Sequence, residues 1–251
     1  MTEKLPHDDI LPYHDSLLGK KEQVAGMFDD IAPRYDFLNR FLSLGIDVGW
    51  RKKAIRQLKK DQPKLILDVA TGTADMAIMA CKMLQPEKIT GIDISEQMLE
   101  LGRKKIEKEG LSDRIELYTG DSETINFPAN SFDAIMVAFG VRNFEHLDKG
   151  LKEMLRVLKP GGQVVILEFS KPKNIAIRKL YNLYMGIIAP KVAGWFCKNK
   201  DAYNYLNESA KAFPERHQLL KIMNETGYAQ ASFKPLSLGI CCIYCGRKVN
   251  S

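Results

Sequence analysis

Residues 65–75, with the sequence LILDVATGTAD, decide the fold class of this 251-residue chain. The first five are mostly large and apolar, as expected of a buried strand, and the small residues that follow predict a turn into a helix. Working outward, apolar runs of strand length alternate with segments of helical periodicity. This alternation is typical of the α/β class with a doubly wound, mostly parallel sheet. The expected strands are 65–70, 89–92, 115–118, 132–138 and 163–169, and the expected helices are 75–83, 95–108 and 146–158.

Helical periodicity also precedes this alternating region, and Pro33 interrupts it. Residues 1–20 lack periodicity and predict a flexible arm. The expected N-terminal helices are 21–32, 37–44 and 48–58. The chain is therefore predicted to consist of an arm (1–20), a helical N-terminal lid (21–60) and a main domain (61–251) with an inserted basic and apolar segment (170–210) on the acceptor side.

The C-terminal region predicts a helix over 214–226, followed by two strands, 230–235 and 240–247, that form a C-terminal hairpin on the sheet. Three of the five cysteines lie in the second strand. On a strand, Cys242 and Cys245 point to opposite faces, so they are not expected to bind one metal ion together. The four histidines show no ligand spacing and are expected at the surface or in helix caps. We therefore expect no metal site.

The composition indicates a globular chain, with 45% hydrophobic and 27% charged residues. No apolar run reaches the roughly 18 to 20 residues that a membrane span needs. The N-terminus is polar and lacks the apolar core of a signal peptide. The chain is therefore expected to be cytoplasmic.

The net charge of +6 is concentrated in residues 171–200, which hold seven Lys or Arg residues and no acidic residue. Large apolar residues lie among these charges, a pattern typical of an amphipathic element that rests on anionic lipid headgroups. A core helix with a basic outer face is the alternative. No recognised nucleic-acid-binding motif accompanies the basic run, so no nucleic acid partner is expected. We therefore expect peripheral contact with the inner face of a membrane.

The turn after the first strand predicts the kind of ligand that this chain binds. It lacks both the Gly-x-Gly-x-x-Gly of dinucleotide sites and the Gly-Lys-Ser/Thr of phosphate loops, since Gly72 is its one glycine. Small residues flanked by Asp68 and Asp75 suit a neutral or cationic ligand close to the backbone, such as S-adenosylmethionine. Asp93 ends the second strand, where a carboxylate accepts hydrogen bonds from both ribose hydroxyls.

The end of the third strand completes this predicted nucleoside pocket. Asp121 and Ser122 follow Gly120 there and are expected near the adenine. A cap on the following turn is the structural alternative for Asp121. A nicotinamide-dependent oxidoreductase remains an alternative class, but it would need phosphate-compatible glycines that residues 70–75 do not provide.

Several motifs show that the chain resembles the ubiquinone/menaquinone biosynthesis C-methyltransferases, a family with the class I S-adenosylmethionine-dependent fold. The resemblance runs from about Val24 to Arg247. The Lys-Pro-Gly-Gly turn is shared by many methyltransferases, whereas the Phe-Gly-Val-Arg-Asn and Tyr-x-Tyr-Leu-x-Glu-Ser runs are specific. The motifs are APRYDFLN (32–39), the Gly72-Thr73 loop, FGVRN (139–143), RVLKPGG (156–162), LEFSKP (167–172) and YNYLNES (203–209).

The resemblance implies methylation of a ring carbon of a polyprenylated quinol, with S-adenosylmethionine as co-substrate. The first expectation is conversion of demethylmenaquinol to menaquinol; the alternatives are the benzoquinol intermediate of ubiquinone synthesis and another small phenolic or lipid acceptor. Some relatives carry Asn followed by a small residue at 121–122, and some carry a donor-contacting Ser at position 138. Ala138 can pack on the donor but cannot donate a side-chain hydrogen bond. The residues implied to hold the donor are Thr73, Asp93, Asp121 and Ser122.

Methylation of an aromatic carbon requires a neighbouring hydroxyl to lose its proton, and a phenolic hydroxyl has a pKa of roughly 10. Arg142, just past the fourth strand, is the expected stabiliser of the oxyanion, with Asn143 orienting it or a water molecule. Because a guanidinium is not readily deprotonated, we expect a water relay or a hydroxide held by Arg142. The structural alternative for Arg142 is an ion pair with Asp133 or Glu145.

The aromatic side chains Tyr35, Tyr203 and Tyr205 are the candidates for contact with the quinol ring, by stacking or hydrogen bonding. Ordinary half-buried aromatic residues are the alternative. The sequence leaves the oligomeric state open, with a homodimer as one possibility.

Overall fold

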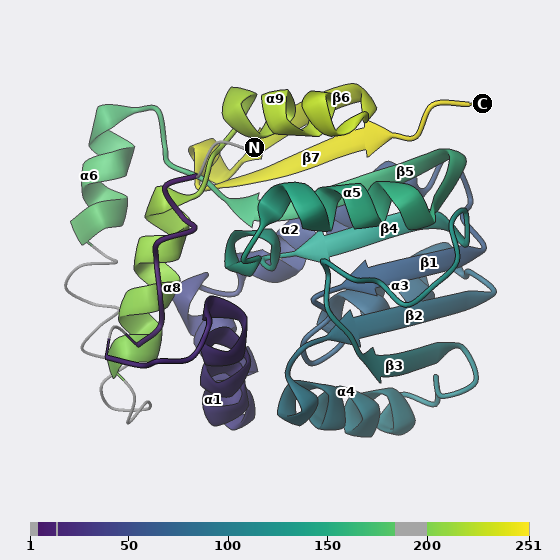
Figure 1. The fold of residues 1–251 in the computed structure, drawn as a ribbon, viewed down its shortest axis with the longest axis horizontal. Coiled ribbons are helices and arrows are strands. Elements are labelled where there is room, and N and C mark those ends of the chain that lie inside the picture. The colour runs from purple at the N-terminus through teal and green to yellow at the C-terminus, as the bar shows by residue number, and fades with distance from the viewer. Residues whose placement is uncertain (1–4, 14, 184–199, 251) are drawn as a thin grey trace.

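The computed structural model describes residues 5–13, 15–183 and 200–250, and a seven-stranded sheet lies at its centre (Figure 1). The strand order is β3-β2-β1-β4-β5-β7-β6. Strands β1 to β5 pair in parallel, and β7 pairs antiparallel with β5 and β6. The predicted α/β class, doubly wound sheet and C-terminal hairpin are confirmed. The strands are β1 (Leu65–Val69), β2 (Lys88–Asp93), β3 (Ile115–Thr119), β4 (Phe132–Ala138), β5 (Leu158–Phe169), β6 (Ala229–Leu236) and β7 (Cys241–Arg247).

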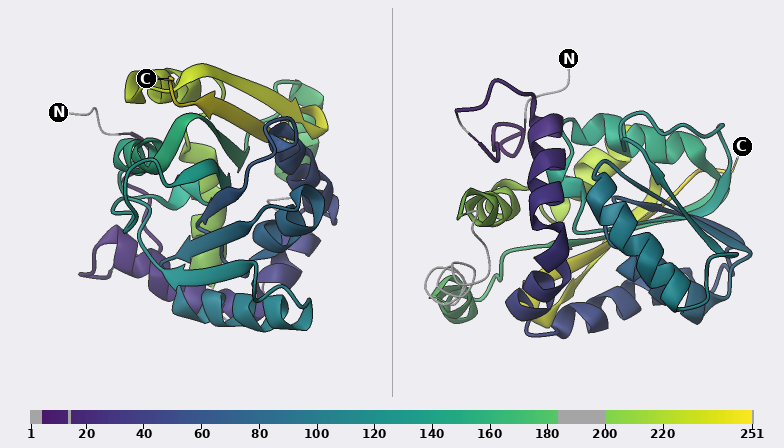
Figure 2. Two further views of the ribbon diagram at one scale, coloured as in Figure 1. Left: turned by 90° about the vertical axis from the view of Figure 1, so that its right-hand side faces the viewer. Right: turned by 90° about the horizontal axis from the view of Figure 1, so that it is seen from below.

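Helices cover both faces of this sheet (Figure 2). Side chains alternate along each strand, so that Ile66 lies in the apolar core with α2, α3 and α4, and Leu67 in the core with α5 and α9. Both faces are buried, which explains why the parallel strands read as nearly continuous apolar runs. The helices are α1 (Lys20–Leu42), α2 (Ile46–Ile55), α3 (Asp75–Leu84), α4 (Glu96–Lys108), α5 (Leu147–Val157), α6 (Ile175–Leu183), α8 (Lys200–Ala212) and α9 (His217–Thr226), with short 3-10 turns at η1 (Arg56–Leu58), η2 (Val141–Asn143) and η4 (Ser237–Gly239).

Helix α1 is continuous through Pro33, so the predicted interruption there is wrong. A proline inside a helix removes a backbone hydrogen bond and costs about 3 kcal/mol. The helix nevertheless continues because Met27 and Ile31 are buried on one side of it, in a cluster with Met98 of α4 and Tyr205 of α8. The Pro33 ring lies on the exposed side. Tertiary packing thus outweighs the local signal.

The described part of the N-terminal arm packs on the molecule. Lys20 Nζ donates a hydrogen bond to the carbonyl oxygen of His7 at 2.6 Å. The His7 ring is fully buried and stands edge-on to Phe213, so the predicted surface or cap position is wrong for this histidine. Burial lowers the pKa of His7 to about 4, which leaves the ring neutral at pH 7.

Strand β5 begins at Leu158, five residues before the predicted start at 163, because Leu158 already pairs with Phe132 of β4. Register along β7 places Cys242 in the core with α5 and α9, whereas Cys245 packs against the opposite core. The prediction that these two side chains point to opposite faces is confirmed.

Of the inserted segment 170–210, the structure describes α6 and α8, and residues 184–199 lie outside the described part. In the described residues we find no helix with both the length and the apolar character needed to cross a bilayer. Helix α8 lies beside α1 (Figure 1), and Ala202 and Tyr205 of α8 belong to the same apolar cluster as α1.

Candidate active site

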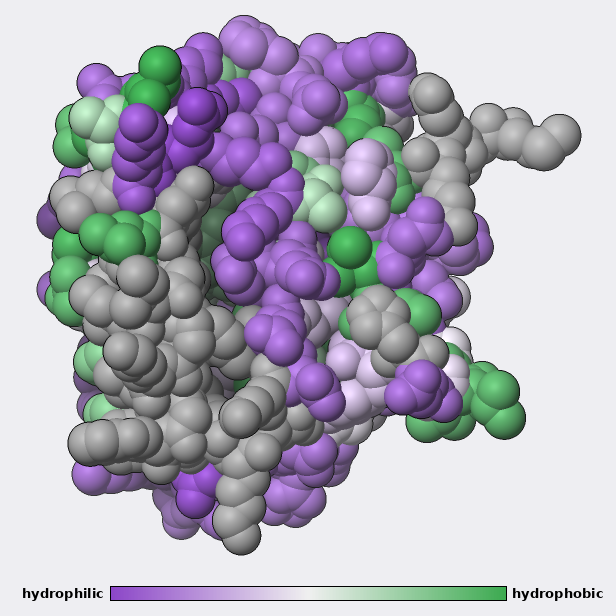
Figure 3. Space-filling model, turned by 90° about the vertical axis from the view of Figure 1, so that its left-hand side faces the viewer, coloured by the Kyte–Doolittle hydropathy of each residue, from purple (hydrophilic) through white to green (hydrophobic). Residues whose placement is uncertain are grey.

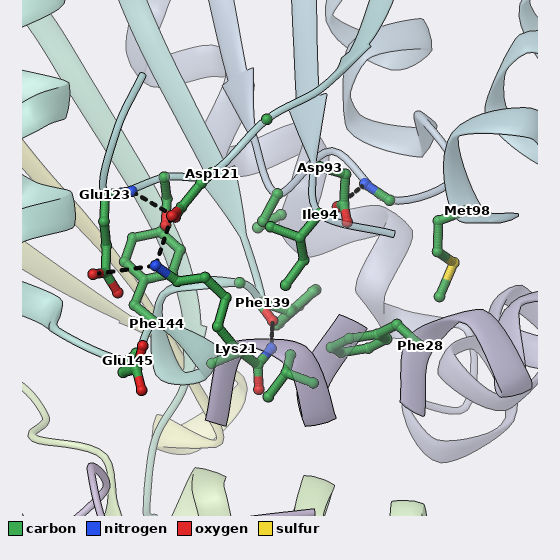
Figure 4. Close-up of a pocket in the computed structure, with 18 of the residues that line it drawn as sticks. Lys21, Phe28, Asp93, Ile94, Met98, Asp121, Glu123, Phe139, Phe144 and Glu145 are labelled. Carbon is green, nitrogen blue, oxygen red and sulfur yellow. Dashed lines mark hydrogen bonds and ion pairs between the residues drawn. The ribbon is translucent and has the colours of Figure 1, made fainter. Parts of the chain in front are cut away.

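A cavity lies where the parallel strands end, between the sheet edge and α1 (Figure 4). Its sheet side is formed by residues that follow or end β1 to β4, and its opposite wall by Lys21, Val24 and Phe28 of α1. Five of the six predicted donor-binding residues line this one cavity: Gly72, Asp93, Asp121, Ser122 and Ala138. The carboxyl ends of parallel strands meet at one edge of a sheet, which is why residues so far apart in the chain converge here.

Asp93 is the central carboxylate of the cavity. Its Oδ2 accepts a hydrogen bond from the backbone N–H of Gly72 at 2.8 Å, and its Oδ1 accepts one from the backbone N–H of Ser95 at 3.0 Å. Burial raises the pKa of Asp93 to about 6, although these hydrogen bonds oppose the shift. The carboxylate is therefore held in place and largely ionised at pH 7. Gly72 has a φ of +56°, a conformation that favours glycine at this turn.

The far end of the cavity holds an ion pair that the sequence did not reveal. Lys21 Nζ of α1 donates to Asp121 Oδ2 at 2.6 Å and lies 3.5 Å from Glu123 Oε2 (Figure 4). Asp121 Oδ1 also accepts from the backbone N–H of Glu123 at 2.9 Å, so the turn cap considered as a structural alternative is present. No local pattern links Lys21 to a residue 100 positions away, since this contact depends on how α1 folds back.

Thr73 does not line the cavity. It is buried, its Oγ1 donates to Asp36 Oδ1 at 2.6 Å, and it accepts from Lys105 Nζ at 2.8 Å. Lys105 also binds Asp75 Oδ1 at 2.7 Å. Thr73 borders a smaller adjoining cavity instead, which shares Tyr35, Ala70, Gly72 and Ala138 with the first and is also lined by Arg51, Asp68 and Asp75.

Arg142 lies beside the cavity in a buried polar cluster and is 4% exposed. Its Nη1 donates to Glu168 Oε1 and to the carbonyl oxygen of Phe139, both at 2.7 Å. The partners considered for it from sequence, Asp133 and Glu145, are wrong. Burial opposes the charge of Arg142, but the Glu168 carboxylate more than compensates and raises the pKa of the guanidinium.

The remaining predicted residues divide between the cavity and its surroundings. Asn143 and Tyr35 line the cavity. Tyr205 is 2% exposed and lies in the cluster between α1 and α8. The Tyr203 side chain lies outside the described residues. Sequence reasoning missed Lys21, Phe28, Met98, Glu123 and Glu168, and of these only Glu168 stands in a recognised motif.

Among the described residues, Glu123, Glu145 and His146 bring three potential metal ligands within 4.8 Å of one another. Glu123 Oε1 accepts from the backbone N–H of His146 at 2.8 Å, and its Oε2 faces Lys21. These carboxylate oxygens already have partners. The expectation of no metal stays a prediction.

The sheet order with its antiparallel β7, together with a carboxylate ending β2 in a cavity at the strand ends, defines a class I S-adenosylmethionine-dependent methyltransferase. The model of the ubiE/COQ5 methyltransferase family matches residues 17–248. The chain belongs to this family, and it is an S-adenosylmethionine-dependent C-methyltransferase.

Known relatives match over nearly the whole chain. The demethylmenaquinone methyltransferase of Bacteroides fragilis is 49% identical over 244 residues, which is 97% of this chain and 99% of that protein. The ubiquinone/menaquinone biosynthesis C-methyltransferase UbiE of Geotalea daltonii is 45% identical over 92% of this chain and 99% of its own length. A solved structure from Thermotoga maritima, a possible histamine N-methyltransferase, has a TM-score of 0.64 at 16% identity, covering 89% of this chain and 99% of that one. That last likeness shows the fold alone.

The pH dependence of donor binding tests whether the Asp93 carboxylate accepts hydrogen bonds from the ribose of the donor. Because its pKa is raised to about 6, Asp93 becomes protonated as the pH falls from 7 to 5 and loses acceptor capacity for ribose hydroxyls. Protonation of Asp93 alone is expected to raise the Kd for S-adenosylmethionine about tenfold between pH 7 and pH 5, because it competes with binding. Calorimetry on Asp93→Asn is the control: it should bind more weakly, and this component of the pH dependence should vanish. An unchanged pH profile in the variant would contradict the assignment.

Proposed function

We propose that this protein transfers the methyl group of S-adenosylmethionine to a ring carbon of demethylmenaquinol, producing menaquinol. The relatives that are named demethylmenaquinone methyltransferases support this acceptor, because the matches cover 91% to 97% of the chain. The observation that carries the donor half of the proposal is the convergence of Gly72, Asp93 and Asp121 on one cavity at the strand ends.

The donor residues have distinct roles in this proposal. Asp93 accepts hydrogen bonds from both ribose hydroxyls, and Asp121 with Ser122 borders the adenine. Ala138 packs on the donor next to its sulfonium. The methionine end extends past Gly72 into the adjoining cavity, where Asp68 suits the ammonium group and Arg51 the carboxylate. Thr73 borders that end and also ties α1 to the sheet edge through Asp36.

Arg142 and Asn143 serve the chemical step in this proposal. The guanidinium stabilises the negative charge that develops on the acceptor oxygen, and Asn143, the next residue, lines the donor cavity. Tyr35, which lines both cavities, contacts the acceptor ring, and Tyr203 and Tyr205 are its proposed partners on α8.

A benzoquinol acceptor is the second candidate function. It is favoured by one observation, the 45% identity with a relative whose name covers both ubiquinone and menaquinone biosynthesis. The two candidates differ only in the ring of the acceptor.

Product analysis tests the proposed acceptor directly. Purified protein, S-adenosylmethionine and chemically reduced demethylmenaquinol should give menaquinol, detected by mass spectrometry, whereas the oxidised quinone should not react because its ring carbon is not electron-rich. NAD should show no saturable binding in parallel calorimetry. Turnover of a demethylated benzoquinol alone would select the second candidate, and turnover of neither would overturn both.

The variant Arg142→Met tests the role of the guanidinium, since it keeps much of the apolar stem and removes the charge. We expect single-turnover methyl transfer to fall by about 100 to 1,000-fold, the scale for loss of one stabilising contact to an oxyanion. Donor affinity should remain nearly unchanged, because the contact exists only as the reaction proceeds. A variant that melts early and loses donor affinity in step with its rate would instead show that the ion pair with Glu168 is structural.

We further propose that the protein works in the cytoplasm, docked on the inner face of the membrane that holds its prenylated acceptor. Large apolar side chains project from the described surface beside basic ones: Ile175 and Leu183 of α6 are 62% and 55% exposed. Arg178 and Lys179 are exposed on the same helix. Figure 3 views the side of the molecule on which α6 lies in Figure 1, and it shows apolar side chains scattered among hydrophilic ones. This mixture suits an anionic headgroup region.

Vesicle sedimentation tests this docking with a matched pair of charge reversals. Arg178→Glu with Lys179→Glu should weaken binding to anionic vesicles by about tenfold or more, at about 1 kcal/mol for each basic residue near the surface. Lys104→Glu with Lys108→Glu makes the same charge change on α4 and should leave binding nearly unchanged. Equal losses in both variants would show that only net charge matters.

A further inference from the structure

A buried polar cluster lies next to the donor cavity and is built from three separate elements. Arg142 comes from η2, Glu168 from β5 and Tyr205 from α8, and they are 4%, 0% and 2% exposed. Asn143, the neighbour of Arg142, lines the donor cavity, so the cluster borders the place where the methyl group is delivered.

Glu168 uses only one of its two carboxylate oxygens. Its Oε1 accepts from Arg142 Nη1 at 2.7 Å and from its neighbouring backbone N–H, that of Phe169, at 2.9 Å. Its Oε2 is buried and has no hydrogen-bond partner among the described residues. Arg142 is likewise held through Nη1 alone in the bonds that we observe, and its buried Nε has no partner within the described chain.

Two more buried atoms in this neighbourhood lack a partner in the described part of the structure: the Tyr205 hydroxyl oxygen and Asn143 Oδ1. Buried polar atoms are nearly always hydrogen-bonded, so four such atoms together point to a polar group of a bound molecule with which they form hydrogen bonds. Burial raises the pKa of Tyr205 further above neutrality, which keeps its hydroxyl protonated and able to donate.

The Arg156–Glu153 pair provides an internal comparison. There both carboxylate oxygens are occupied, Oε1 by Arg156 Nε at 2.8 Å and Oε2 by Nη2 at 2.8 Å. Oε2 also accepts from the backbone N–H of Ile125. In this two-pronged geometry the guanidinium and the carboxylate satisfy each other. The single-pronged pair at Glu168 leaves one acceptor and one donor free.

A hydroxyl group fits this arrangement, because it donates one hydrogen bond and accepts others. Its proton can point to Glu168 Oε2 while its oxygen accepts from Arg142 Nε or from the Tyr205 hydroxyl. A phenolic hydroxyl on the ring to be methylated is such a group.

We propose that Glu168 is the general base of the reaction, taking the proton from the acceptor hydroxyl while Arg142 holds the oxygen; this inference rests on the proposed quinol acceptor. The O–H bond breaks and a bond from hydrogen to the Glu168 carboxylate forms. Electrons from the oxygen flow through the ring, whose carbon forms a bond to the methyl group as the S–CH₃ bond breaks and its electron pair returns to sulfur. The ring carbon then loses its hydrogen as a proton, the oxygen regains one, and the net proton leaves from Glu168 to solvent.

This assignment explains how an arginine that is already ion-paired can stabilise an oxyanion. Before the proton moves, the negative charge that faces Arg142 lies on Glu168. Afterwards Glu168 is neutral and the charge lies on the acceptor oxygen. The cluster keeps the same total charge throughout, so no unpaired charge arises in a buried site.

The decisive experiment is the single-turnover methylation rate of Glu168→Gln as a function of pH, with reduced demethylmenaquinol as acceptor. We expect a loss of about 100 to 10,000-fold at pH 7, the range for removing a general base. The loss should shrink as the pH approaches the hydroxyl pKa of roughly 10, because the acceptor then ionises without help. An acceptor made more acidic by a ring halogen should restore part of the rate in the variant and have little effect on the wild type.

Two further variants separate this role from a structural one. Glu168→Asp keeps the negative charge near Arg142 but moves the carboxylate away from the acceptor hydroxyl. Its donor affinity and melting temperature should therefore be unchanged. Its methylation rate should be reduced and should recover as the pH rises. Glu153→Gln makes the same chemical change in the two-pronged pair and should leave the rate unchanged. Donor affinity and thermal melts of all three establish that they are folded.

The outcomes are distinct for the inference and for the proposed function. If the wild type methylates demethylmenaquinol and either Glu168 variant is fully active, or is impaired equally at every pH and with every acceptor, the base is not Glu168. If the wild type does not methylate demethylmenaquinol but methylates another phenol, the proposed acceptor is wrong, and the same pH series on that phenol decides the role of Glu168.

Discussion

The parallel pairing of β1 with β2 and with β4 is the constraint on which the rest of the structure depends. Leu65 to Val69 pair in register with β2 and Ile66 to Val69 with β4, so the residues that follow each strand emerge at one edge. The hydrogen bond from the Gly72 backbone to Asp93 joins two of these strand ends directly. Positive φ angles at Ala70, Ala74 and Phe139 show how sharply the backbone turns there.

Helix α1 converts this open edge into a cavity, and charged side chains tie it down at both ends. Lys21 binds Asp121 at one end, and Asp36 binds Lys105 at 2.5 Å at the other. Between them, Asp29 accepts from the Ser95 hydroxyl at 2.6 Å at the start of α4. Partly exposed ion pairs contribute only modestly to stability. Burial of the apolar cluster beneath α1 therefore supplies most of the free energy that holds this helix against the sheet edge. The polar contacts fix which residues face the donor.

The chemistry proposed for the site depends on burial as well as on residue type. Asp93 and Arg142 are both charged and both almost inaccessible, and each is compensated in a different way. Backbone N–H groups hold the Asp93 carboxylate, whereas the Glu168 carboxylate of β5 holds Arg142. The free-energy cost of burying a charge is tolerated where such partners exist. The same burial keeps water away from a reaction that needs a dry, ordered pocket.

The sequence by itself predicted the fold class and the central strands, apart from the early start of β5, because apolar periodicity is a local signal. The turn after β1 predicted the donor, and motifs such as FGVRN (139–143) indicated the family. The sequence also placed Gly72, Asp93, Asp121, Ser122 and Ala138 together, since strand ends converge by a general rule. Only the tertiary structure decided that α1 runs through Pro33, that Thr73 faces Asp36, that Lys21 reaches Asp121, and that Glu168 is the partner of Arg142. Each of these depends on contacts between segments distant in the chain, whose packing energy exceeds the local preferences that a sequence displays.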